Sequence, residues 1–377
     1  MKRINKGTKV FVIIILTVFI LLSLVACGIY SYLTSIEFDY IVDEKTNTVT
    51  ITGIGTDDGT LIIPETIEGR PVISIADYAF ENNSNLVMIK FPDTISYIGK
   101  GAFYNCENLI FIFGLEKCIE LKSIESETFK HCNNLHTIKL PNSITSIGSY
   151  VFQFCGNLRE LSIPNSVSYI GKAAFSNCLS IKEFKIPQGV TSIEDGTFLG
   201  CASMESITLP EGITHIGQEA FSACKKLKFV AIPSTVTTIG DAVFTRCYSL
   251  LSIDVAPDNP AYASIDGVLY NKNLTELTAY PAGKTDKTFS IPKGVTTIVK
   301  GTFSCNKNLE TLNIPKDVNS ISNLFLYETL IKTINYEGSV SDWNKIVTIS
   351  TLDCGETFDA IICTDGQIAK DGTVTYK

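Results

Sequence analysis

Cysteine is the residue type with the most obvious capacity for chemistry in this chain, because 12 of the 377 residues are cysteines. Seven of them lie three residues after a phenylalanine and recur at regular intervals along the chain. A metal site needs ligands that converge on one point, whereas regular recurrence predicts a column of thiols. Buried free cysteine behaves as a small hydrophobic side chain. The seven are Cys106, Cys132, Cys155, Cys178, Cys201, Cys224 and Cys247.

Disulfide bonds are the alternative interpretation of these cysteines. Stacked strands lie about 4.8 Å apart, which is within the Cα separation that a disulfide tolerates. Parallel side chains and the odd number favour a structural column of free thiols. Cys118 lies in a three-residue insertion and Cys305 is displaced by one position. Cys354 and Cys363, near the C-terminus, are the pair that would form a disulfide in an oxidising compartment.

The three histidines suggest catalysis only weakly. His131 and His136 flank Cys132, and a cysteine with a neighbouring histidine can act as a nucleophile. Cys132, however, belongs to the predicted column, and His136 occupies a repeat position that looks exposed. The "GTDDGT" segment at 55–60 lacks the ligand spacing of a calcium loop. The sequence therefore predicts no catalytic residue, no metal and no cofactor, although an enzyme of unknown type is a remote alternative.

A repeat of 23 residues must position these cysteines. The phenylalanines that precede them are separated by 23 residues, except for one interval of 26. A fixed period in this range is typical of a solenoid, in which each unit covers its apolar face by stacking on its neighbours. The repeated phenylalanines are Phe80, Phe103, Phe129, Phe152, Phe175, Phe198, Phe221 and Phe244.

Each repeat contains one predicted strand and one predicted turn. In the segment 158–164, apolar residues alternate before Pro164, which predicts a short strand ending at the proline. Between Gly171 and Cys178, the four-residue spacing of Ala174 and Cys178 suggests one helical or 3₁₀ turn. Stacked copies of this unit predict a rod with a parallel sheet on one face.

The N-terminal 27 residues have the layout of a secretory signal, with basic residues before an apolar stretch. The stretch ends in Leu24-Val25-Ala26-Cys27, which resembles a bacterial lipoprotein signal, so Cys27 is the predicted lipid anchor. The alternative is an uncleaved transmembrane helix, because the span from Val10 to Glu37 carries no charge before the glutamate. Both interpretations place the repeats outside the cytoplasmic membrane, anchored at the cell surface.

The overall charge is mildly acidic, with 31 lysines and arginines against 39 aspartates and glutamates. An acidic surface repels nucleic acid and anionic lipid. The composition therefore excludes a general nucleic-acid-binding function, and it does not identify a partner.

The repeat, approximately I-G-x-x-A-F-x-x-C-x-x-L-x-x-I-x-I-P-x-x-V-x-x-I, resembles the BspA-type leucine-rich repeat over residues 73–334. Three flanking segments also resemble that family: "IIPETIEGRPVISIADYAF" (62–80), "SIDGVLYNKNLTELTAYPAG" (264–283) and "INYEGSVSDWNKI" (334–346). The resemblance implies a strand-rich α/β solenoid. This would be a curved, right-handed leucine-rich-repeat stack with a parallel sheet on its concave face and short helical turns or loops opposite.

The domain organisation follows from the repeat and its interruptions. Phe244 and Phe303 are 59 residues apart, two periods plus thirteen, and the extra residues are rich in turn formers. We expect a signal peptide or anchor at 1–27, a linker and hairpin cap at 28–70, repeats at 71–255, a hairpin insertion at 256–290, further repeats at 291–334 and a C-terminal cap at 335–377.

Variable outward positions of the predicted strand are the candidate binding surface, since solenoids often use such an extended face. Phe229, Met88 and Phe111 are large apolar residues where other copies carry polar ones, although each side chain could instead pack on a neighbouring turn. Tyr97 and Tyr169 hold a second variable position. The strand positions are Met88 and Lys90, Phe111 and Phe113, Thr137 and Lys139, Glu160 and Ser162, Glu183 and Lys185, Ser206 and Thr208, Phe229 and Ala231.

The family resemblance implies a surface-displayed or secreted protein that adheres noncovalently to host or microbial proteins or glycans. The predicted partners are an extracellular protein or glycan and, through the N-terminal lipid or helix, a membrane. The alternative is an envelope-associated structural scaffold without a soluble ligand. Neither the ligand nor the oligomeric state follows from the sequence.

Overall fold

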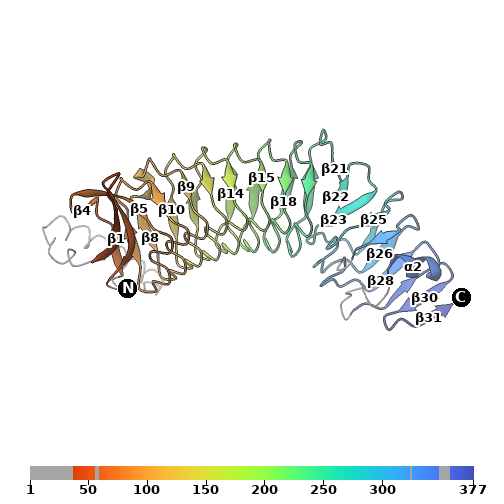
Figure 1. Ribbon diagram of the computed structural model, residues 1–377. Coiled ribbons are helices and arrows are strands. Elements are labelled where there is room, and N and C mark those ends of the chain that lie inside the picture. The colour runs from red at the N-terminus through yellow and green to blue at the C-terminus, as the bar shows by residue number, and fades with distance from the viewer. Residues whose placement is uncertain (1–36, 56–58, 323–324, 348–356) are drawn as a thin grey trace, which may run out of the picture.

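The computed structural model describes residues 37–55, 59–322, 325–347 and 357–377. In this part of the chain the repeats stack into an arched rod, with a hairpin at the N-terminal end and a small cap at the C-terminal end (Figure 1). Nearly all of the regular structure is strand, and the described helices are the short η1 (Leu115–Lys117) and α2 (Val340–Ile346). The prediction of a strand-rich solenoid is confirmed.

The strands predicted after each cysteine stack in parallel, hydrogen-bonded in groups of two or three, and we call this series the first ladder. Its register is one repeat, so Glu183 pairs with Ser206 and Lys185 with Thr208. Alternation places Phe184 in the core and its two neighbours at the surface, as a half-buried strand requires. Up to the insertion, the strands are β3 (Thr60–Ile62), β6 (Met88–Lys90), β8 (Phe111–Phe113), β10 (Thr137–Lys139), β12 (Glu160–Ser162), β14 (Glu183–Lys185), β16 (Ser206–Thr208), β18 (Phe229–Ile232) and β20 (Ser252–Val255).

A second series of parallel strands, not predicted from the sequence, lies at the isoleucine before the recurring turn of each repeat, and we call it the second ladder. Its strands have two residues each, as in the pairing of Ser192 with His215 and Ile193 with Ile216. The isoleucines are buried and the residues before them face outward. The second ladder comprises β7 (Tyr97–Ile98), β9 (Ser123–Ile124), β11 (Ser146–Ile147), β13 (Tyr169–Ile170), β15 (Ser192–Ile193), β17 (His215–Ile216) and β19 (Thr238–Ile239).

Stacked turns occupy the segment between glycine and cysteine, in place of the helical or 3₁₀ turn that its spacing suggested. The residues two before and two after each phenylalanine have positive φ, for example Ala173 (51°) and Asn177 (59°) around Phe175. This conformation directs N–H groups along the rod. Phe175 N–H donates to Thr197 O (2.9 Å), and Asn177 N–H donates to Leu199 O (2.6 Å) of the next turn. We call these stacked turns the turn column.

A column of phenylalanine rings forms the centre of the core. The ring centroids of consecutive members lie 5.2 Å apart at Phe80 and Phe103 and 5.7 Å apart at Phe198 and Phe221, with the planes nearly parallel. Offset stacking of this kind contributes about 0.5–1.5 kcal/mol per pair beyond the buried area. The rise from one repeat to the next thus matches the distance between stacked aromatic rings.

The insertion divides the hydrophobic core into two parts. One runs from Val49 to Leu269, and the other from Val268 to Ile368. Between them lie β21 (Tyr262–Ile265), β22 (Val268–Asn271) and β23 (Glu276–Ala279), which form an antiparallel meander. β23 then continues the second ladder by pairing in parallel with β25 (Thr297–Ile298), followed by β27 (Ser320–Ile321). Figure 1 shows the rod bending at this point.

Each end of the array is covered by additional strands. β1 (Phe38–Asp43) and β2 (Thr48–Ile54) form an antiparallel hairpin, and β2 pairs with β5 (Arg70–Ile75), which also pairs with β4 (Thr66–Ile67). Beyond the insertion, strands at the same repeat position as the first ladder are β24 (Thr288–Ser290), β26 (Thr311–Ile314) and β28 (Thr333–Tyr336). It ends with β29 (Ala360–Ile362), β30 (Gly366–Ala369) and β31 (Val374–Tyr376). Trp343 of α2 is fully buried in this cap.

The left-handed turn positions generate a stability prediction. We expect Ala223→Gly to raise the free energy of unfolding by about 0.5–1 kcal/mol, because Ala223 has φ of 59° and glycine removes the cost of that conformation, partly offset by its greater chain entropy. Ala220→Gly is the matched control. Ala220 is fully buried and is not among the residues with positive φ, so its loss should cost about 1–2 kcal/mol. Urea denaturation measures both, and equal destabilisation by the two substitutions would contradict the turn geometry.

Candidate functional site

The outward positions of the first ladder recur from one repeat to the next along the rod. Phe229 is the most exposed of its large apolar residues, with 55% of its surface accessible, whereas its neighbour Val230 is buried. On the middle strands Glu160, Glu183 and Lys185 are exposed. The structure therefore places the candidate strand residues on one side of the rod, as alternation requires.

An apolar group occupies the N-terminal end of this surface. Met88 and Phe111 are half-buried and pair across β6 and β8, while Phe113 is 40% exposed and its ring centroid lies 6.1 Å from that of Phe111. Lys90 lies beside Phe113 in the ladder and is exposed. These side chains form an apolar area with one basic residue at its edge.

The two candidate tyrosines belong to the second ladder and not to the first. Tyr97 and Tyr169 are 42% and 47% exposed. Tyr97 OH donates to Asp77 Oδ1 (3.4 Å), and partial burial together with that carboxylate raises the pKa of the tyrosine. The two rings are separated by three repeats, so they are isolated features and do not form one patch.

The cysteine column is buried, and each thiol has a defined hydrogen-bond partner. Cys178 Sγ donates to Phe152 O (3.1 Å), and Cys201 Sγ donates to Phe175 O (3.2 Å), the carbonyl of the phenylalanine one repeat earlier. Burial raises the pKa of Cys201 to about 12 and that of Cys178 well above its ordinary value. All ten described cysteines are free and buried. The column is therefore a structural element in the described chain.

Asparagine replaces cysteine at this position in two repeats. Asn83 Oδ1 accepts from the N–H groups of Asn85 and Leu86, at 3.1 and 2.9 Å. Asn306 makes the equivalent bonds in the repeat of Phe303. Both side chains satisfy backbone donors near the end of the turn. This explains why Cys305, one residue earlier, lies outside the column.

The histidines near Cys132 do not form a nucleophilic pair. His131 stacks on Phe154, with ring centroids 4.6 Å apart, and burial lowers the pKa of His131. The pKa of Cys132 is raised well above its ordinary value by burial, so this thiol is protonated at neutral pH. Within the described residues, no group of three or more histidine, cysteine, aspartate or glutamate side chains could hold a metal ion.

A polar cluster at the bend could not be found from the sequence, because its members are about 80 residues apart. Arg246 donates to Tyr327 OH (2.8 Å) and to Glu328 Oε1 (2.9 Å), and Tyr248 OH donates to Glu328 Oε2 (3.3 Å). The hydrogen bond to Tyr327 and the pairing with Arg246 lower the pKa of Glu328. The cluster joins the last turn before the insertion to the repeats after it.

Two sequence predictions lie outside the described residues. These are the lipid anchor at Cys27, together with the whole segment 1–27, and Cys354 of the proposed disulfide; its partner Cys363 is a free, buried thiol. Among the helices of the described ranges, none has the length and apolar character needed to span a bilayer.

Comparison with known proteins identifies a repeat family. The family described as BspA type leucine-rich repeat region, with six copies, matches residues 60–182, 122–251, 168–286 and 284–347. These overlapping matches cover the repeats on both sides of the insertion. None of the curated proteins compared with the chain matches it.

Two solved structures of leucine-rich repeat proteins illustrate the likeness in fold. A leucine-rich cell surface protein from Faecalibacterium prausnitzii is 26% identical, with a TM-score of 0.60, covering 87% of this chain and 94% of that one. A leucine-rich repeat protein from Bacteroides ovatus is 20% identical, with a TM-score of 0.53, covering 87% of this chain and 98% of that one. The second likeness concerns the fold alone.

Burial of the cysteine column predicts resistance to thiol reagents. We expect Cys178 in the native protein to remain unlabelled by a maleimide at neutral pH, because it is inaccessible and its pKa is raised, and to react fully after denaturation. A Ser162→Cys variant provides the accessible control, since Ser162 is exposed on the first ladder. Mass spectrometry of the labelled peptides gives both rates. Native labelling of Cys178 as fast as that of the control cysteine would contradict the packing.

Proposed function

This chain belongs to the BspA-type leucine-rich repeat family, and on that premise we propose that it is a bacterial cell-surface protein that recognises an extracellular protein or glycan noncovalently. The similar cell surface protein from Faecalibacterium prausnitzii supports the location. The observation that carries the recognition function is the exposure of large apolar side chains on the first ladder, above all Phe229 and Phe113.

The apolar residues define two anchor points on this surface. Met88, Phe111 and Phe113 form the first, at the N-terminal end. Phe229, which is 55% exposed, forms the second, and the 42% exposed Leu251 immediately precedes the strand that pairs with it. Aromatic residues are enriched among the side chains that dominate binding energy. A partner that covers both would contact an extended face of the rod.

Charged residues lie among serines and threonines on the surface between the anchor points. Arg159 and Lys182 occupy the same position in consecutive repeats, and Glu160 and Glu183 occupy the next position. None of the four takes part in an ion pair among the described residues. A partner with complementary charges would fix the binding register.

The anchor completes the proposal. Lipidation of Cys27, or an uncleaved apolar helix within residues 1–27, would hold the repeats at the outer surface of the cytoplasmic membrane or envelope. The acidic composition supports a partner other than nucleic acid. No catalytic step or cofactor enters this function.

Direct binding measurements test the function. Residues 37–377, immobilised for surface plasmon resonance, would be presented with extracellular matrix proteins, mucin and bacterial cell-wall glycans. Saturable binding to one of them, at micromolar affinity or tighter, is the expected result. A lack of binding across this panel, by protein shown by circular dichroism to be folded, would contradict ligand recognition and favour an envelope scaffold.

Substitution of Phe229 tests the binding surface. We expect Phe229→Ala to weaken capture of the identified partner about tenfold or more, as for a central aromatic anchor, while changing the free energy of unfolding by less than about 0.5 kcal/mol, because the ring is exposed. Phe221→Ala is the control, since Phe221 is fully buried and its loss should cost about 3–5 kcal/mol. A large loss of stability in Phe229→Ala, or unchanged capture, would remove Phe229 from the binding surface.

A further inference from the structure

A hollow of about 310 Å³ interrupts the surface of the turn column just before the bend. It is lined by the residues two and four positions after the phenylalanine in four consecutive repeats. In the two middle repeats, three of these four side chains are no larger than a methyl group, whereas both flanking repeats carry larger ones. The lining pairs are Asn177 and Leu179, Gly200 and Ala202, Ala223 and Lys225, and Arg246 and Tyr248, and Glu328 joins them from beyond the insertion.

The wall of the hollow nearer the N-terminus presents a hydrogen-bond acceptor. Gly200 in the floor has φ of 75°, and a Cβ atom at this position would clash with Asn177 Oδ1. The amide oxygen of Asn177 therefore lies against the floor. Asn177 Nδ2 donates to Ser176 Oγ (3.0 Å), and no described residue donates to Oδ1. This oxygen is available to a donor on a ligand.

Arg246, on the opposite wall, is held in place by residues from beyond the insertion. Its Nη2 atom donates to Tyr327 OH and Glu328 Oε1, and the guanidinium carbon lies 5.4 Å from the centroid of the Tyr327 ring. Nε and Nη1 have no acceptor among the described residues, and 44% of the side chain is exposed. A guanidinium fixed in this way keeps a planar set of donors that suits a carboxylate.

The charges of the lining favour a ligand with a single negative charge. Lys225 is exposed and belongs to no ion pair among the described residues. Lys225 and Arg246 face one carboxylate, that of Glu328, so the hollow has one positive charge in excess on a chain of net charge −8. A phosphate monoester carries about −1.5 to −2 charges and would be repelled more strongly by Glu328 than a carboxylate would be.

The remaining groups of the lining suit a sugar ring. Leu179 is an exposed apolar side chain, and the ring of Tyr248 offers a second apolar contact, while Asn177, Lys225 and Arg246 supply polar groups around the same hollow. A sugar combines apolar C–H faces with hydroxyl groups. Small-molecule sites have volumes of about 300–1,000 Å³, so this hollow has room for one sugar unit and excludes the side of a folded protein.

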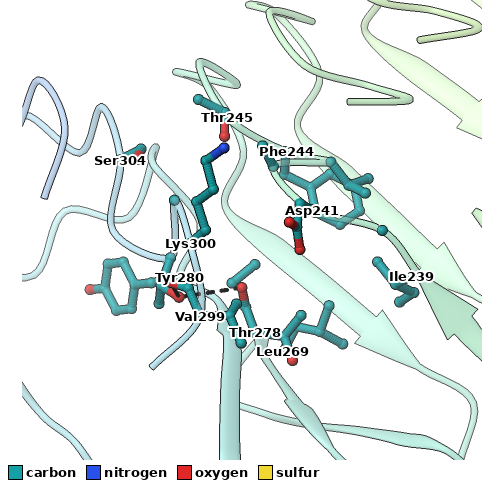
Figure 2. A pocket seen from close by; sticks show the side chains of 16 residues that line it. Ile239, Asp241, Phe244, Thr245, Leu269, Thr278, Tyr280, Val299, Lys300 and Ser304 are labelled. Atoms are coloured by element: carbon teal, nitrogen blue, oxygen red, sulfur yellow. Dashed lines mark hydrogen bonds between the residues drawn. The ribbon is translucent and has the colours of Figure 1, made fainter. Parts of the chain in front are cut away.

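The bend next to the hollow is too closely packed to hold an organic ligand. About 30 Å³ remains between the turn 240–245 and residues 278–280 and 299–302. Figure 2 shows Lys300 extending across this space toward Thr245. The wall that carries Arg246 is therefore supported by packed side chains, and a ligand at this end of the turn column would bind in the surface hollow.

From this geometry we propose that the hollow binds the carboxylated sugar unit of an acidic glycan. Arg246 and Lys225 pair with the carboxylate, Asn177 Oδ1 accepts from a sugar hydroxyl, and Leu179 and Tyr248 contact the ring. The site lies on the turn column and shares no residue with the first-ladder surface. It rests on the proposed function only in placing the chain outside the cytoplasmic membrane.

A saturation-transfer NMR titration of the full chain in mild detergent tests the site. The probes are the methyl glycosides of N-acetylneuraminic acid and of glucuronic acid, which distinguish a sialic acid from a uronic acid. Saturable binding of at least one, at about millimolar affinity or tighter, is the expected result, with methyl glucoside and acetate at least tenfold weaker. Binding of neither acidic probe, or equal binding of methyl glucoside or acetate, would overturn the proposal.

Two matched pairs of variants locate the bound sugar. Lys225→Gln should weaken binding about fivefold, whereas Lys226→Gln removes the same charge from an exposed neighbour outside the hollow and should have little effect. Ala202→Leu fills the floor and should abolish detectable binding. Asn133→Leu places the same side chain at the same repeat position three repeats earlier and should retain binding. Equal effects within either pair, for variants that circular dichroism shows to be folded, would overturn the proposal.

Competition separates this site from the proposed function. Capture of mucin or a cell-wall glycan that an excess of the acidic sugar displaces belongs to the hollow, and capture that persists belongs to the first ladder. Sugar binding without any persistent capture would support the hollow and contradict recognition by the first ladder. Persistent capture without sugar binding would overturn the hollow alone.

Discussion

The turn column is the interaction on which the rest of this structure depends. Its N–H groups donate from each turn to the next, which requires left-handed residues on both sides of every phenylalanine. That geometry fixes the distance from the phenylalanine and the cysteine of one turn to those of the next turn. The phenylalanines then stack in parallel, and each cysteine donates to the phenylalanine carbonyl one repeat earlier. The backbone hydrogen bonds, the ring stacking and the thiol hydrogen bonds are therefore all formed by the same shift from one repeat to the next.

Because consecutive repeats are related by a constant shift, their short strands line up in two ladders. The outward side chains of these ladders face solvent at regular intervals. Because the inward positions are required for packing, polar and charged variation between repeats lies mostly at outward positions, whose members include Phe229 and Glu183. A partner would therefore be distinguished by the order of side chains along the rod. The bend adds a change of direction where the column, the first ladder and the core are all interrupted.

The sequence was sufficient to predict the solenoid, the first ladder and the buried cysteine column, because each depends on a residue type repeated at a fixed interval. The second ladder was missed although Ile147 and Ile193 recur with the same period. The left-handed turns were also missed, although asparagine or glycine at positions such as Asn177 and Gly200 was an available signal. The cluster of Arg246 and Glu328 depends on how the insertion folds, and no local pattern reports it.

Native-state hydrogen exchange of the turn amides tests the central claim most directly. If the one-directional column holds the stack together, the amides of Phe103, Phe152 and Phe198 should exchange only through global or subglobal unfolding. The amide of Phe244, at the interruption, should exchange faster than these three. Exchange of the three amides at the rate of exposed loops would contradict the account.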